Sequence, residues 1–137
     1  MVISLDNAGG TLTDISGSSN AVSLTFSNEV GTYRRAGSDA PTRYLEAQDL
    51  SISLSVVYST ASGEGLALLR AWAAGSIGGG DARTIRIDVP DSTSGSDRYQ
   101  VEVLPGNLEI PLASNEGGPV LVTAALESTG AYTVSTI

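Results

Sequence analysis

The 137-residue sequence lacks cysteine, histidine and lysine, so its seven basic residues are all arginine. Without cysteine or histidine the chain has no disulfide framework and no structural zinc site, because such sites use thiolate and imidazole ligands. A Ser-His-Asp or Cys-His relay is excluded, and so is a lysine Schiff base. The side chains that remain for catalysis are carboxylates, tyrosines and hydroxyls.

Positive charge is scarce as well, since 15 acidic residues against seven arginines give a formal net charge of −8. Proteins that hold nucleic acid neutralise its phosphates with clustered Lys and Arg. The charge therefore argues against such binding. No run approaches the roughly 20 apolar residues of a membrane span, and residues 1–6 show no signal-peptide pattern. We expect no membrane span, no metal site and no cofactor.

Apolar and polar residues alternate along much of the chain, which predicts strands with one buried face. The clearest cases are residues 20–30 and 49–59. Further strands are expected at 84–89, 98–103, 108–112, 119–127 and 132–136, with a turn at Pro105–Gly106.

Residues 62–75 have a different composition, rich in Ala and Leu, and predict one short helix with Ser62 as N-cap and Gly75 as terminator. The predicted fold class is therefore mainly β, as one domain over residues 1–137. It is an antiparallel β-sandwich or partly closed barrel with a flanking helix at about 62–75 and a long loop at about 29–48.

Two of the expected strands carry small hydroxyl side chains on their polar faces. These residues are Ser23, Thr25, Ser27, Ser51, Ser53 and Ser55. Ordinary solvent-facing strands more often carry Lys, Glu and Arg. The pattern is interpreted either as a solvent face of low charge or as a wall facing another subunit or a narrow channel.

The polar segment 29–48 is the second candidate site. A structureless loop of that length within a compact domain usually has a function or is disordered. It holds five residues of types that are enriched at protein interfaces: Tyr33, Arg34, Arg35, Arg43 and Tyr44. On an acidic protein, they would complement the acidic surface of a second copy.

Two acidic patterns have weaker functional interpretations. Asp91 and Asp97 could hold a weak calcium ion, but their spacing fits no EF-hand and a solvated hairpin loop is favoured. Glu102 and Glu109, expected on neighbouring strands, could act as a carboxylate pair on a glycoside, although acids are common on polar strand faces. We therefore predict no enzyme and no catalytic residues.

Several short segments follow one another in a characteristic order: Ile3–Thr11, Asp49–Leu54, Ala67–Leu69, Glu109–Pro111 and Val122–Leu126. Across essentially the whole chain, this order resembles the tail tube proteins of long-tailed bacteriophages, which are related to the tube proteins of type VI secretion systems. The resemblance implies a β-sandwich with one helix and a structural virion protein. Family members form hexameric rings that stack into a tube through which the genome leaves the virion.

The resemblance also implies partners and a location. The partners are other copies of the chain, tape measure, terminator, and distal tail or baseplate proteins, and a sheath where the tail is contractile. DNA passes through the lumen without specific binding. The protein would be made in the bacterial host cytoplasm and would reside in the virion tail.

By the same resemblance, residues 29–48 would contact the adjacent ring through the five interface residues, and the two hydroxyl-rich faces would line the lumen. Composition leaves a competing interpretation open, namely a monomeric carbohydrate-binding or adhesin-like sandwich. Such modules usually expose several aromatics, and aromatic residues here total only 5%.

Overall fold

The computed structural model describes the chain except for residues 8, 60, 62, 76–81 and 112–119. The expected N-cap at Ser62 and the outer ends of the strands expected at 108–112 and 119–127 lie outside the described residues. The elements in chain order are β1 (Val2–Asp6), β2 (Leu12–Asp14), the 3₁₀ helix η1 (Ser16–Ser18), β3 (Ser19–Tyr33), β4 (Thr42–Val57), α1 (Gly65–Gly75), β5 (Arg83–Val89), β6 (Asp97–Glu109) and β7 (Leu121–Thr136).

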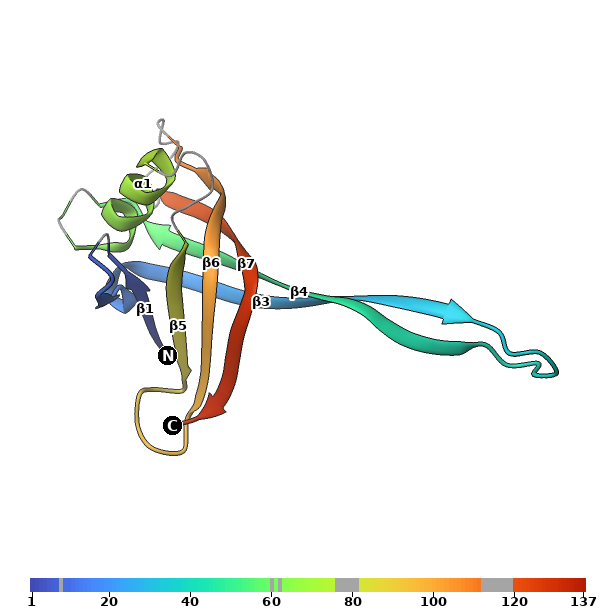
Figure 1. Cartoon of the computed structure of the whole chain (residues 1–137). Helices are drawn as coiled ribbons and strands as arrows, with labels where there is room; N and C mark the ends of the chain where they lie inside the picture. The colour runs from blue at the N-terminus through green and yellow to red at the C-terminus, as the bar shows by residue number, and fades with distance from the viewer. Residues whose placement is uncertain (8, 60, 62, 76–81, 112–119) are drawn as a thin grey trace.

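The described strands form one antiparallel sheet with the order β2-β1-β5-β6-β7-β4-β3. Figure 1 shows β3 and β4 running across β5 and β6, while β7, which pairs with both β4 and β6, bends from one direction into the other, so the curled sheet makes two crossing layers. The sheet does not close into a barrel, and β3 and β2 remain its edges. The prediction of a mainly β, sandwich-like fold with one short helix is confirmed.

The core lies inside the curl, where the apolar faces of the alternating strands meet. Ile52 and Leu54 of β4 are fully buried there with Ile85 of β5 and Val103 of β6. Burial of this kind stabilises a fold by about 25 cal/mol per Å² of apolar surface removed from water. The alternation seen in the sequence therefore fixes which face of each strand points inward.

Helix α1 packs against β6 and β4 and contributes Leu66, Leu69 and Trp72 to the core. Its first amide, Gly65 N–H, donates a hydrogen bond to the Ser18 hydroxyl at 3.0 Å. A residue 47 positions earlier thus satisfies one of the amides that a helix start leaves unpaired. A Cβ at Gly65 would lie 2.9 Å from Val56 Cγ1, so only glycine lets the helix start this close to β4.

The prediction of a long loop at 29–48 is wrong. β3 continues to Tyr33 and β4 begins at Thr42, so the connection covers only residues 34–41. Antiparallel pairing continues through this polar stretch because the ladder is made by backbone groups, which need no apolar side chains.

The prediction of a turn at Pro105–Gly106 is also wrong, because β6 continues through these two residues to Glu109. The register against β7 shifts between Pro105 and Asn107, so the proline lies at an irregularity in the ladder, where its missing N–H is tolerated. The two expected C-terminal strands are likewise one strand, β7, with another register shift opposite residues 101–103 of β6.

A nearly buried carboxylate ties β5 to the start of β6. Asp88, 1% exposed, accepts hydrogen bonds from Arg98 Nε at 2.8 Å and Nη2 at 3.1 Å, and from the Ser92 hydroxyl at 3.0 Å. The hydrogen bond from Arg98 is the main reason that the pKa of Asp88 lies below the ordinary 3.8, against the opposing effect of burial. The folded state therefore holds Asp88 in its charged form.

Asp88→Asn should lower the free energy of unfolding by about 2 kcal/mol near pH 7, because it removes a charge-assisted bidentate contact from a buried site. A depressed folded pKa stabilises the protein above the unfolded pKa, and that stabilisation is lost as the pH falls through the folded pKa. Urea denaturation should therefore show the gap between wild type and variant shrinking in acid. Asp97→Asn, the same change at an exposed position at the start of the neighbouring strand β6, is the control. A gap independent of pH would contradict the assignment.

Candidate functional site

The outer halves of β3 and β4 form a two-stranded arm, residues 27–49, that projects from the body (Figure 1). β4 pairs with β7 only from Ser51 onward, so within the described sheet the arm strands pair only with each other. The base is held by Tyr132, whose hydroxyl donates to Gln48 Oε1 at 3.4 Å and whose ring meets the Phe26 ring edge-on at 5.9 Å. These contacts fix the direction in which the arm extends from the sheet.

An aromatic pair organises the far part of the arm. Gly31 lies opposite Tyr44, and a Cβ there would come within 2.4 Å of Tyr44 Cζ, so the ring lies across the bare glycine. Tyr44 donates its hydroxyl proton to Glu46 Oε1 at 3.0 Å, and its ring lies 5.9 Å from that of Tyr33. Covering a strand glycine with an aromatic ring from the paired strand is a known way to pin register.

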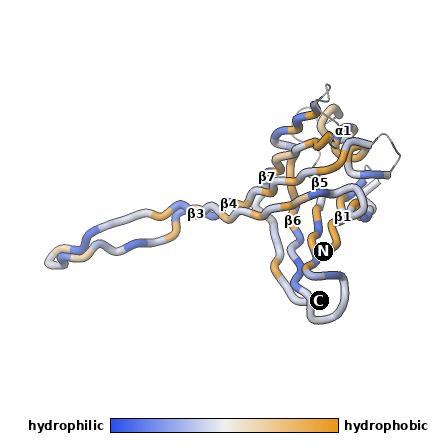
Figure 2. The backbone as a smooth tube through the Cα atoms, turned by 180° about the vertical axis from the view of Figure 1, so that it is seen from behind, coloured by the Kyte–Doolittle hydropathy of each residue, from blue (hydrophilic) through white to orange (hydrophobic). Residues whose placement is uncertain are grey.

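The arm exposes large apolar side chains to solvent. Val30, Tyr33, Tyr44 and Leu45 are each 45–56% exposed. In Figure 2 the arm shows isolated hydrophobic points along a mostly polar ribbon. Isolated two-stranded ribbons are marginally stable in water, and on this one Val30 and Leu45, which lie directly opposite each other, leave a paired apolar surface uncovered.

Positive charge is concentrated at the tip of the arm, residues 33–43. The tip contains Arg34, Arg35, Arg43 and Asp39, for a net charge of +2, whereas the other residues of the chain carry four arginines and 14 acids, for −10. Arg35 Nη2 donates to the Tyr33 hydroxyl at 3.5 Å.

The structure therefore brings the five interface residues expected from the sequence together at the end of the arm. Sequence reasoning missed Val30 and Leu45, which lie opposite each other in the ladder. The available signal was their apolar character within a polar segment.

The six hydroxyl residues also come together, as one surface that we call the hydroxyl face. Ser23 lies opposite Ser53, and Thr25 opposite Ser51. Four of the six side chains are exposed, and Ser51 and Ser55 are half-buried. Since the neighbouring positions on both strands point into the core, the hydroxyl face lies on the opposite side of the sheet from the core.

Next to β4, the hydroxyl face continues onto Thr123 and Glu127 of β7 and Glu109 of β6, none of which is basic. Ser55 is opposite Thr123, which is opposite Glu109, and Ser51 is opposite Glu127. At its other end Ser27 is opposite Asp49. The result is a broad surface of short polar groups and carboxylates.

The two weaker acidic patterns have structural explanations. The Asp91 carboxylate accepts hydrogen bonds from the Thr93 amide and hydroxyl and from the Ser96 hydroxyl, and the Thr93 hydroxyl does most to lower its pKa. Within the described ranges no three acidic side chains cluster as a metal site would require. Glu102 and Glu109 share one strand, β6, so their expected placement on neighbouring strands is wrong. No helix in the described part of the chain is long and apolar enough to cross a membrane.

Comparison with solved structures finds this fold in tail assemblies. A chain from the tail of an empty gene transfer agent particle, refined with C6 symmetry, matches with a TM-score of 0.71 at 19% identity, covering 98% of this chain and 95% of that one. A chain of the extended sheath–tube complex of an extracellular contractile injection system (PVC) gives 0.74 at 13%, covering 99% and 88%. A chain of the SPP1 tail tube gives 0.73 at 8%, covering 98% and 76%.

No protein-family model and no curated protein matches the sequence. The structural neighbours are chains from the tail or virion of gene transfer agents, from contractile injection systems and from the SPP1 tail tube, and this chain shares their fold. The resemblance noted in the sequence is thereby confirmed for the fold.

Gly31→Val should displace the Tyr44 ring and loosen the arm while leaving the body intact, because the new side chain collides with the ring and with nothing in the core. Limited trypsin digestion should cut faster after Arg34, Arg35 and Arg43, with a thermal midpoint close to wild type. Thr32→Val places the same valine side chain at the next, exposed position, where it replaces a hydroxyl by a methyl group, and is the control. Equal cleavage rates in the two variants would argue against the role of the ring.

Proposed function

We propose that this chain is a structural tail tube protein whose copies form hexameric rings that stack into a hollow tube. The observation that carries the proposal is the fold shared, over 97–99% of the chain, with subunits of tail assemblies. The tail that contains one of these subunits has C6 symmetry. By this proposal the protein belongs to the virion and acts without catalysis.

The open edges of the sheet support assembly. β3 and β2 leave backbone N–H and C=O groups on their outer sides without a partner in the sheet. Such edges are aggregation hazards in a monomer, and pairing with the next subunit in a ring uses them. A contact between unlike surfaces that closes on itself yields a ring, whereas stacking of rings yields an open filament.

The hydroxyl face suits the wall of the lumen. A wall past which DNA moves must not hold phosphates, so it should present short polar or acidic groups and lack long basic side chains. The hydroxyl face and its continuation on β7 and β6 have this chemistry, with Asp49, Glu109 and Glu127 as the charged groups at its margins. DNA would thus be a passing cargo.

The arm suits contact with the adjacent ring. It carries the exposed apolar side chains and the positive tip away from the body, while the rest of the chain is strongly acidic. Opposite charges on the two surfaces would orient each ring on the next. Further tail proteins, such as a terminator, tape measure, baseplate component or sheath, would bind the ends, lumen or outside of the tube.

Replacing Arg34 and Arg35 together by Glu should leave the fold intact and prevent stacking, because the tip changes from +2 to −2. Negative-stain electron microscopy of concentrated protein should show tubes for wild type and separate rings or subunits for the variant. Arg70→Glu, an exposed single change on α1, is the control. Normal tubes from the double variant would refute the tip's role, and wild type that stays monomeric at every concentration would refute the tube.

Ser53→Lys should allow assembly but slow DNA release, because a long cation in the middle of the hydroxyl face would attract passing phosphates. The measurement is the rate of DNA release from particles that carry the variant, and the slowing should fade as salt is added. Ser94→Lys, in the exposed loop after β5, makes the same charge change outside the hydroxyl face. Unchanged release kinetics would show that this face does not line the lumen.

A further inference from the structure

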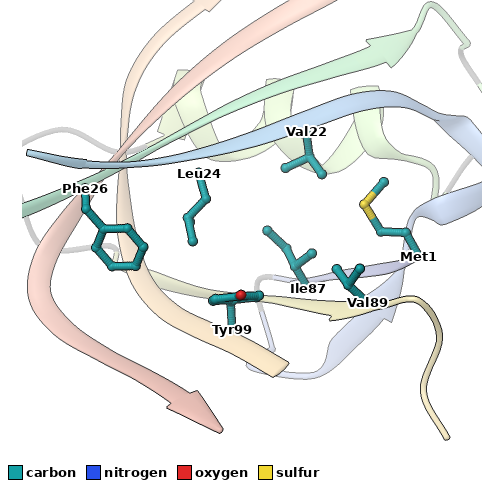
Figure 3. Close-up of a pocket in the computed structure, with 7 residues that line it drawn as sticks. All are labelled: Met1, Val22, Leu24, Phe26, Ile87, Val89 and Tyr99. Carbon is teal, nitrogen blue, oxygen red and sulfur yellow. The ribbon is translucent and has the colours of Figure 1, made fainter. Parts of the chain in front are cut away.

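An apolar pocket of about 290 Å³ opens between edge strand β3 and the strands that it crosses. Its lining residues are Met1, Val22, Leu24, Phe26, Ile87, Val89 and Tyr99. In Figure 3 the side chains from β3 point toward those from β5 and β6, with Met1 at one end. The pocket exists because the sheet stops at β3 without closing, so the inward side chains of this strand are covered on one side only.

The exposed large apolar side chains of the described chain fall mostly into two groups. One group is at the pocket. Met1, Phe26 and Val89 line it, and Val134 of β7 lies opposite Tyr99 of β6, which is also a lining residue. The other group is on the arm: Val30, Tyr33, Tyr44 and Leu45. The first group surrounds a pocket and the second lies on a projecting arm, so the two surfaces are complementary in shape.

We infer that the pocket receives the apolar side chains of the arm of a second copy of this chain. The inference rests on the proposed function and names the acceptor surface for the arm. The arm cannot reach its own pocket, because it points away from the body (Figure 1). A cavity of roughly 150 Å³ is enough to bind benzene, so this pocket has room for a tyrosine ring or a leucine side chain.

Charge favours the same occupant. The arm tip carries +2 and the rest of the chain −10. At the pocket, Asp91 follows Val89 by two residues and Asp97 precedes Tyr99 by two, and both carboxylates are exposed. Arg98 is engaged with buried Asp88, so its charge is largely compensated there. An arm entering the pocket would therefore bring its arginines to the exposed carboxylates of Asp97 and Asp91, the second of which already lies near the Met1 ammonium.

The contact joins two different surfaces, so each chain both gives an arm and accepts one. Such a contact is heterologous and adds copies in one direction. It would bury the arm's apolar groups and fill the pocket in a single step, and both gains come from removing apolar surface from water. The stacking direction of the rings would then be set by the direction of the arm.

The absence of native cysteine allows a direct test. One variant carries Leu45→Cys on the arm and another carries Val89→Cys at the pocket. The two proteins are mixed and treated with a short bismaleimide. We expect covalent dimers from the mixture and almost none from either variant alone. In the control mixture, Ser53→Cys on the hydroxyl face replaces Val89→Cys, and few dimers should form.

The outcomes separate this inference from the proposed function. Dimers confined to the arm–pocket mixture support the inference. Absence of dimers, or equal dimer formation with Ser53→Cys, overturns it, even if electron microscopy shows normal tubes from the same samples. If no tubes form under any condition, the proposed function fails, yet dimers confined to the arm–pocket mixture would still establish the contact.

Discussion

The ladder between β3 and β4 is the interaction on which the rest of the structure depends. Within the body it carries the alternating residues whose apolar side fills the core and whose polar side forms the hydroxyl face. Beyond Phe26 and Leu50 the same ladder continues with no further strand beside it and becomes the arm. One set of backbone hydrogen bonds therefore fixes the core, the smooth polar wall and the direction of the projecting ribbon together.

The second constraint is that the sheet curls without closing. A closed barrel would cover the inward face of β3 and remove the sheet edges. Here β3 stays an edge, its inward side chains line an open pocket, and the arm displays tyrosines, valine and leucine to solvent. Each of these features costs a monomer free energy or solubility, and each becomes favourable when another copy covers it. These are the properties that the proposed assembly requires of its subunit.

Local patterns predicted much of this architecture. Alternation located the strands in the body, and the pairing of Ser23 with Ser53 agrees with the expectation of two adjacent hydroxyl-rich strands. The composition of residues 62–75 predicted the helix. The clustering of tyrosine and arginine near residue 34 predicts a contact surface, and these residues lie at the end of the arm.

The missed features depend on interactions that no local pattern encodes. The polar composition of residues 29–48 predicts a loop, yet backbone pairing needs only a register, and Gly31 under the Tyr44 ring helps to hold it. Pro105–Gly106 predicts a turn, but the structure accommodates the proline at a register shift. The pocket could not be foreseen because Val22 and Val89 are far apart in sequence and meet only through the curl of the sheet.

The distribution of arginine connects these features to function. A tube that guides DNA needs some surfaces that attract other subunits and one surface that does not attract phosphate. A lysine is a flexible cation with a wide reach, and the chain has none. Arg98 is held by Asp88 and Arg83 lies over Trp72, whereas three of the seven arginines are displayed at the arm tip and Arg70 is exposed on α1. The arm tip thus concentrates positive charge away from the hydroxyl face, and in the proposed tube this separation would let attraction between subunits and indifference to DNA coexist in one acidic chain.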